Sequence, residues 1–106
     1  MRINLNYNEF NLGHLMQVEN GYLWTPNIKE IARADEKYEL AMDMFFLPNE
    51  QVIYPFVPRH FNEFLDASER ADLKEKAGIE DDDSEFVRLY KMGKLDYFSQ
   101  EFVIKS

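Results

Sequence analysis

Cysteine is absent from the 106 residues of this chain. Its absence excludes disulfides, thiol nucleophiles and thiolate metal sites together. A small domain without such cross-links must depend on packing, and an apolar fraction of 45% with an aromatic fraction of 15% is enough for a packed core. We therefore expect one folded domain over residues 1–106, located in the reducing environment of the cytoplasm.

Long apolar runs are also missing. The longest candidate, residues 40–47 (LAMDMFFL), is interrupted by Asp43 and is far shorter than the roughly 20 residues that span a bilayer. No charged-then-apolar signal peptide opens the chain. The sequence predicts no association with a membrane.

Basic residues are scarce, because 12 Lys and Arg stand against 20 Asp and Glu, for a net charge of −8. This sign argues against direct binding to nucleic acid, since affinity for phosphates comes from Lys and Arg that displace counterions. It argues equally against anionic membranes. The same sign favours a basic protein as partner, and solubility alone is the alternative reason for an acidic composition.

Alternating polarity predicts strands in the N-terminal half. Ile3, Leu5 and Tyr7 alternate with asparagines, which is typical of a half-buried strand. Asn20-Gly21 is the preferred pair for a two-residue type I′ turn and predicts a hairpin.

The predicted turn also sets the pairing within this hairpin. It places Glu19 opposite Tyr22, Val18 opposite Leu23 and Gln17 opposite Trp24. Tyr22 and Trp24 then share one face of the hairpin with the polar residues Gln17 and Glu19.

Helical periodicity follows the hairpin. Asn27 and Glu30 fit a capping box, and apolar residues then recur within one band of about 100° as far as Phe45. Pro48 sets the end, because the residue before a proline avoids helical geometry. The pattern predicts one long helix over about residues 28–46, with a strand over residues 40–46 as the alternative.

Shorter helices are expected in the C-terminal half. Pro58 can start a helix through residues 59–65, Gly78 ends another, and Ser84 can cap a third. Residues 95–104 fit a helix and a strand equally. The predicted class is α+β: a small antiparallel sheet, formed by the N-terminal strand and the hairpin, packs on the long helix, with shorter helices appended.

Signatures of catalysis are missing from the sequence. The four glycines form no phosphate-binding loop, and no serine lies in a strand-turn-helix elbow. The acidic run at residues 80–85 (EDDDSE) fails as a calcium loop, because Phe86 stands where the turn glycine is required. We expect no catalytic residue, no metal, no cofactor and no enzymatic activity.

The same acidic run is a candidate for imitating nucleic-acid phosphates. Residues 59–85 hold ten acidic and four basic residues, a local charge of −6. Acids three apart on a helix lie about 5–6 Å apart, and duplex DNA offers a phosphate every ~3.4 Å along each strand, so the two densities are comparable. The pairs Asp66–Arg70 and Asp72–Lys76 favour the alternative, an ordinary solvated helix and linker.

Partner binding is accordingly assigned to these acids and to two aromatic residues of the hairpin. Exposed Tyr and Trp often anchor protein interfaces, although burial of Trp24 in the core is the alternative. The candidate residues are Tyr22, Trp24, Glu69, Asp72, Glu75, Glu80, Asp81, Asp82, Asp83 and Glu85.

These features suggest a non-catalytic interaction protein that inhibits a basic, nucleic-acid-binding partner by occluding its groove. Small inhibitors that phages and mobile elements direct against host defence nucleases have this general profile. One alternative is an immunity protein or antitoxin that neutralises a basic toxin. The other is a small enzyme or accessory subunit with a pocket near residues 52–60.

Overall fold

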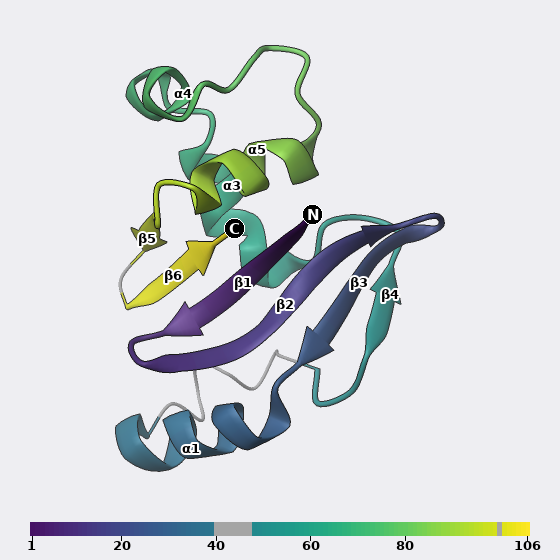
Figure 1. Ribbon diagram of the computed structural model, residues 1–106, viewed down its shortest axis with the longest axis vertical. Helices are drawn as coiled ribbons and strands as arrows, with labels where there is room; N and C mark the ends of the chain where they lie inside the picture. The colour runs from purple at the N-terminus through teal and green to yellow at the C-terminus, as the bar shows by residue number, and fades with distance from the viewer. Residues whose placement is uncertain (40–47, 100) are drawn as a thin grey trace.

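The computed structural model describes residues 1–39, 48–99 and 101–106 (Figure 1). Six strands of this described part form one antiparallel sheet in the order β4-β3-β2-β1-β6-β5. They are β1 (Arg2–Tyr7), β2 (Phe10–Val18), β3 (Gly21–Pro26), β4 (Val52–Tyr54), β5 (Phe98–Ser99) and β6 (Phe102–Lys105). The C-terminal segment, whose pattern fitted helix or strand, thus contributes the last two strands.

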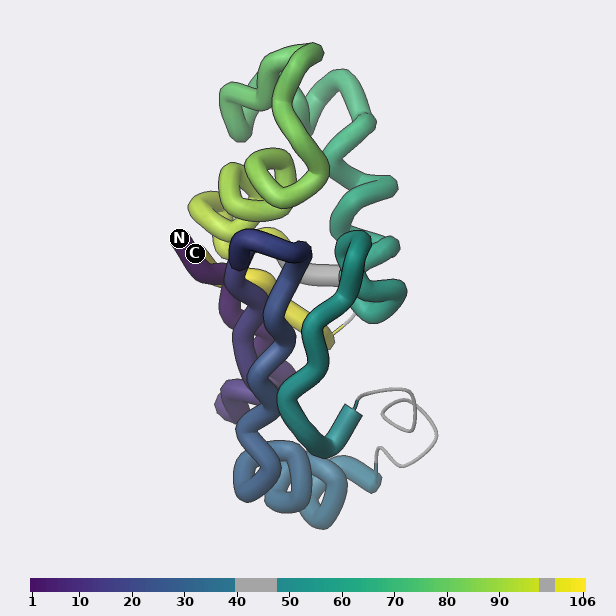
Figure 2. Tube along the Cα trace, turned by 90° about the vertical axis from the view of Figure 1, so that its right-hand side faces the viewer, coloured from purple at the N-terminus to yellow at the C-terminus, as the bar shows by residue number. Residues whose placement is uncertain are grey.

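The helices lie at both ends of the sheet. They are α1 (Ile28–Tyr38), the 3-10 helix η1 (Arg59–Phe61), α3 (Asn62–Ala67), α4 (Ala71–Ala77) and α5 (Glu85–Gly93). Figures 1 and 2 show α3, α4 and α5 gathered towards one end of the molecule and α1 at the other, along a longest dimension of 40 Å. The predicted α+β class is confirmed.

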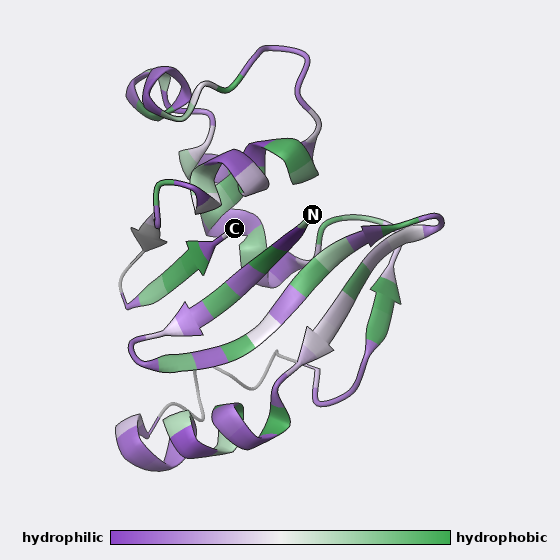
Figure 3. Ribbon diagram, viewed as in Figure 1, coloured by the Kyte–Doolittle hydropathy of each residue, from purple (hydrophilic) through white to green (hydrophobic). Residues whose placement is uncertain are grey.

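Alternation in β1 buries one face of the sheet, as its sequence predicts. Ile3, Leu5 and Tyr7 are buried, and the intervening asparagines point to the other face. Figure 3 shows the corresponding bands of apolar and polar residues along β1 and β2. Leu5 also pairs with the buried Ile104 of β6, so the last strand extends the same apolar face.

Helices from the C-terminal half also pack against this face, in addition to α1 (Ile28–Tyr38). Trp24 on β3 packs against Phe61 of η1, and Tyr22 stacks on Phe86 of α5. Further core side chains from α3 and α5 are Phe64, Leu65, Leu89 and Met92. The short helices therefore supply core contacts beside those of α1, whose Ala34 is buried.

Helix α1 lies across one end of the sheet and packs against β2. Its N-terminus is capped as predicted, since Asn27 Oδ1 accepts a hydrogen bond from the Glu30 N–H at 3.4 Å. It ends at Tyr38 because Glu39 takes a left-handed conformation, with φ 53°. The predicted continuation of the helix, and the alternative strand there, fall on residues 40–46, outside the described residues.

The turn between β1 and β2 anchors the C-terminal end of α1. The Glu9 carboxylate bonds Lys37 and also accepts a hydrogen bond from Tyr38 Oη at 2.7 Å. These two bonds lower the pKa of Glu9 to about 2. The ring of Tyr38 packs against Tyr7 and Phe10, so α1 is attached through apolar as well as polar contacts.

The predicted hairpin is present, with its register shifted by two residues. Val18 pairs with Gly21 and Gln17 with Tyr22, so Glu19 and Asn20 form the turn. Asn20 has no positive φ, and the predicted type I′ turn at Asn20-Gly21 is wrong. The glycine is required for another reason: a Cβ on Gly21 would lie 2.1 Å from the Tyr54 carbonyl oxygen of β4. A shift of two leaves the faces unchanged.

A bulge in β2 makes room for the largest core side chain. Leu5 pairs with Gly13 but Asn6 pairs with Asn11, so Leu12 is an extra residue that turns into the core. A Cβ on Gly13, which has φ +148°, would lie 2.8 Å from the Trp24 ring and 2.5 Å from a backbone oxygen. Only glycine lets the indole lie on this strand.

We predict that Gly13→Ala destabilises the protein by about 2–4 kcal/mol, because it adds overpacking to backbone strain. Gly78→Ala is the matched control: φ is +72° there and a Cβ would meet nothing within 4 Å. Only the left-handed conformation opposes that change, at a cost of about 1 kcal/mol. Urea unfolding measures both, and equal costs would contradict close packing of Trp24 on Gly13.

Candidate acidic interaction surface

The acidic run lies on a segment that two apolar side chains anchor in the core. Leu73 of α4 and Ile79 in the following loop are both buried. Gly78 ends α4 in the left-handed conformation, and the Ile79 N–H donates to the Lys74 carbonyl at 2.9 Å, as in a Schellman motif. The helix stop predicted from the sequence is thereby confirmed, and it directs the chain into residues 80–84.

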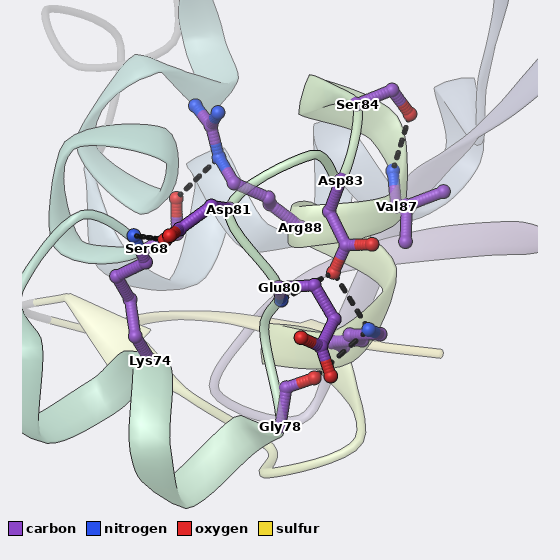
Figure 4. Close-up of polar contacts among 10 residues, drawn as sticks. Ser68, Lys74, Gly78, Glu80, Asp81, Asp83, Ser84, Val87 and Arg88 are labelled. Carbon is purple, nitrogen blue, oxygen red and sulfur yellow. Dashed lines mark hydrogen bonds and ion pairs between the residues drawn. The ribbon is translucent and has the colours of Figure 1, made fainter.

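Asp83 holds this loop against α5 (Figure 4). Its Oδ2 accepts hydrogen bonds from the Glu80 N–H at 2.9 Å and from Lys91 Nζ at 2.6 Å. Lys91 Nζ also donates to the Gly78 carbonyl at 2.9 Å, so one ammonium group joins both ends of the loop. The hydrogen bond from Lys91, followed by that from Glu80, lowers the pKa of Asp83.

The start of α5 continues from this loop without a break. Ser84 Oγ accepts a hydrogen bond from the Val87 N–H at 3.3 Å, which confirms the predicted cap. Glu85 occupies the first turn, where a carboxylate is favoured by the partial positive charge of the helix N-terminus. The loop is therefore bonded at both ends, while its outer carboxylates stay exposed to solvent.

Arg88 ties the turn before α4 to α5. Its Nε donates to Ser68 Oγ at 3.2 Å, and a terminal nitrogen lies 3.7 Å from a Glu69 carboxylate oxygen. Ser68 is fully buried and donates in turn to the Leu65 carbonyl at 2.5 Å. This chain of bonds joins α3, the turn and α5 into one unit.

The carboxylates form the outer layer of this unit, and several of the cations lie beneath them. The Asp81 and Glu69 side chains are 100% and 71% exposed, whereas those of Arg88 and Lys91 are 20% and 29% exposed. We call the exposed carboxylates of this region the acidic surface: Glu69, Asp72, Glu75, Glu80, Asp81, Asp82 and Glu85.

Three of the predicted partner-binding residues are less exposed than the other seven. Asp83 is only 15% exposed, and its hydrogen bonds with Glu80 and Lys91 hold the loop in place. Trp24 is 0% exposed, which places it in the core and away from any partner. Tyr22 is half-buried, with its ring stacked on Phe86 at a centroid distance of 5.8 Å, so only part of it remains accessible beside the start of α5.

The arrangement of acids on α4 also differs from the prediction. The helix begins at Ala71, so Glu69 lies in the preceding turn and only Asp72 and Glu75 lie on α4 itself. The predicted pairs Asp66–Arg70 and Asp72–Lys76 are replaced by other ion pairs. Arg70 bonds Asp72 at 2.9 Å, and Lys74 bonds Asp81 at 3.1 Å.

Sequence reasoning missed the two cations of α5 that face the acids. Arg88 and Lys91 lie three residues apart and therefore on the same side of the helix. The sequence did contain a signal for this: Arg88 and Lys91 follow the predicted cap Ser84 by four and seven residues, which places both on one side of the helix. With them included, residues 59–91 hold ten acidic and six basic residues, a local charge of −4, so the surface is less negative than the run alone suggests.

A cavity of about 450 Å³ lies where the sequence analysis placed an alternative pocket. It is lined by Tyr54, Phe56, Pro58, Arg59, His60 and Asn62. Burial lowers the pKa of His60 to about 4, so the imidazole is neutral at pH 7. Phe56, which also lines the cavity, is 60% exposed.

Comparisons with protein-family models, with curated proteins and with solved structures found no match to this chain. In the part of the chain that the structure describes, no three His, Asp or Glu side chains are grouped to hold a metal ion. The described helices are all too short or too polar to cross a bilayer.

We predict that Asp83→Asn destabilises the protein at neutral pH and that this effect disappears in acid. Because the folded pKa of Asp83 lies below its unfolded value, the ionised group stabilises the fold above about pH 4. That stabilisation is lost as the pH falls through the folded pKa. Urea midpoints from pH 7 to pH 3 test this, with Asp82→Asn as the exposed control. A pH-independent difference would refute the role of the ionised carboxylate.

Proposed function

We propose that this protein is a stoichiometric binder that presents its acidic surface to a basic protein partner. The observation that carries the proposal is the Asp83–Lys91 contact, which holds the loop so that Glu80, Asp81 and Asp82 are displayed in set positions. Displaying charges on an ordered loop reduces the entropy lost on binding. Complementary charge also raises the rate at which the partners meet.

The partner that best matches this surface is a protein with a basic groove for nucleic acid. Closely spaced carboxylates present a charge density comparable to that of phosphates, and the net charge of −8 adds long-range attraction for a basic groove. Bound there, the protein would occlude the groove and act as an inhibitor, as small phage and mobile-element proteins do against host nucleases. Tyr22, half-buried beside the start of α5, would supply an apolar contact at the margin.

We predict that a quadruple variant, E80Q/D81N/D82N/E85Q, slows association with the partner roughly tenfold or more, because it removes steering charges. Copurification from native lysate and mass spectrometry would first identify the partner. Association and dissociation rates of the purified pair would then be measured at several salt concentrations. Added salt should slow association of the native protein far more than that of the variant.

The matched control removes the same number of charges elsewhere. Glu19, Glu36, Glu39 and Glu50 are exposed and lie outside α4, α5 and the loop between them. Their conversion to Gln likewise removes four negative charges from the net charge of −8 but leaves the acidic surface intact. Equal slowing by both quadruple variants would show that net charge acts without a defined surface, and the proposal would then fail.

An immunity protein or antitoxin would use the same surface against a basic toxin. The identity of the captured partner separates the two cases. A partner that binds DNA or RNA, and that releases a labelled duplex when this protein is added, supports inhibition by occlusion. A partner that is toxic when expressed alone, and harmless when coexpressed with this chain, supports neutralisation.

The cavity beside β4 favours a second candidate function, the binding of a small molecule by an enzyme or accessory subunit. Its volume of about 450 Å³ lies within the usual range for ligand sites, roughly 300–1,000 Å³. Aromatic side chains at Tyr54 and Phe56 and polar ones at Arg59 and Asn62 give it the mixed lining of such sites. Uncharged ligands would bind there with little dependence on salt.

For this second function we predict that indole and benzamide shift NMR signals of residues 54–62, with affinities insensitive to salt. Phe56→Ser should weaken binding about threefold or more, because it removes apolar surface from the ligand. Ile53→Ser is the control, since Ile53 is 59% exposed but does not line the cavity. Shifts absent at saturating ligand, or equal loss in both variants, would exclude the pocket as a ligand site.

A further inference from the structure

Half of the twelve Lys and Arg residues, all of which lie among the described residues, have a carboxylate partner. Six form ion pairs: Arg33, Lys37, Arg70, Lys74, Arg88 and Lys91. Arg2 and Lys29 form none with the described residues, and yet both line one cavity together with His14. Three basic side chains therefore line one cavity without an ion pair to any described carboxylate.

This cavity lies on the sheet face opposite the core, where β3 leads into α1. Its volume is about 400 Å³, and its lining is Arg2, Asn11, Gly13, His14, Thr25, Pro26, Asn27, Ile28 and Lys29. The lining contains no carboxylate. In the sheet, His14 stands between Asn4 of β1 and Thr25 of β3, both neutral, so strands β1 to β3 and helix α1 together build the site.

The pKa of His14 is affected by the nearby Arg2. Partial burial lowers its pKa, and the positive charge of Arg2 lowers it further. A bound anion would relieve this repulsion and favour the protonated imidazole. Asn11, Thr25 and Asn27 add amide and hydroxyl groups that can donate hydrogen bonds to the same anion.

We propose that this cavity binds the phosphate group of a small molecule. Arginine offers a planar, bidentate fork to phosphate oxygens, and lysine adds a second permanent charge suited to a dianion. The space exceeds what a single phosphate occupies and leaves room for an organic substituent. The helix start itself adds little, because Asn27 Oδ1 already accepts a hydrogen bond from the Glu30 N–H.

The proposed phosphate site is separate from the acidic surface. It adjoins the start of α1, whereas the acidic surface lies on the turn before α4, on α4, in the following loop and at the start of α5. Helices α1 and α4 lie at opposite ends of the molecule (Figure 1). The two sites carry opposite charge and are built from different elements. A negative result for phosphate binding therefore does not affect the proposal for the acidic surface, and the reverse also holds.

The first test is an NMR titration of the untagged protein with inorganic phosphate at constant ionic strength. Saturable shifts are expected at His14, Thr25 and Lys29, together with a rise in the pKa of His14, since the anion stabilises imidazolium. Glycerol 3-phosphate should bind at the same residues, and glycerol should not. Shifts spread over the chain, matching those caused by chloride, would overturn the proposal.

Vesicles distinguish a free phosphate compound from a lipid headgroup. The protein should not sediment with phosphatidylcholine vesicles that contain phosphatidic acid, because its net charge of −8 opposes anionic membranes. Sedimentation with these vesicles, without binding of glycerol 3-phosphate, would refute the small-molecule assignment.

The second test uses the double variant R2Q/K29Q. Both side chains are exposed, so the fold is retained, which circular dichroism checks. Affinity for glycerol 3-phosphate should fall about tenfold or more, because two charged contacts are lost. Lys76→Gln is the control, since Lys76 is exposed, distant from the cavity and without an ion pair among the described residues. An equal loss in Lys76→Gln, or no loss in R2Q/K29Q, would overturn the proposal.

Discussion

The burial of Trp24 is the contact on which the arrangement of the other elements depends. Its ring lies over Gly13 on the neighbouring strand and beneath His60 and Phe61 of η1, with centroid distances of 4.5 and 5.9 Å to the latter two. This packing holds η1 on the sheet. Because α3 follows η1 directly, the same contact determines where α3, the turn at Ser68 and α4 can lie.

The acidic surface is a consequence of that placement. With α3 and α5 held on the sheet by buried aromatic and aliphatic side chains, Arg88 can reach Ser68 and Lys91 can reach the loop. These cations bond the underside of a segment whose outer side remains acidic. The buried contact between Trp24 and η1 thus helps to order the polar loop after α4. The desolvation cost of the ion pairs is small, because Arg88 and Lys91 stay partly hydrated.

A net charge of −8 conceals how unevenly charge is distributed over the fold. One end of the molecule displays carboxylates above their paired cations. The cavity near the start of α1 has three basic side chains and, among the described residues, no carboxylate in its lining. Global charge governs solubility and long-range attraction, whereas local recognition depends on which side chains meet. The acidic surface and the basic cavity therefore present opposite local charge on one molecule.

The sequence by itself determined the features that depend on neighbouring residues. Alternation in β1, the caps at Asn27 and Ser84 and the helix stop at Gly78 follow from local geometry and were predicted correctly. The acids of the candidate surface were also identified from the sequence, because clusters of charged residues can be seen there and such residues usually stay at the surface.

Tertiary structure alone decided the features that depend on residues far apart in the chain. Gly21 meets the backbone of β4, which moves the hairpin turn to Glu19 and Asn20, and no local signal could reveal that contact. The burial of Trp24 required η1, 35 residues further along, and the pairing of Asp83 with Lys91 required α5 to fold back beneath the loop. The basic cavity has the same origin, since Arg2, His14 and Lys29 come together only when the strands pair and α1 begins beside them.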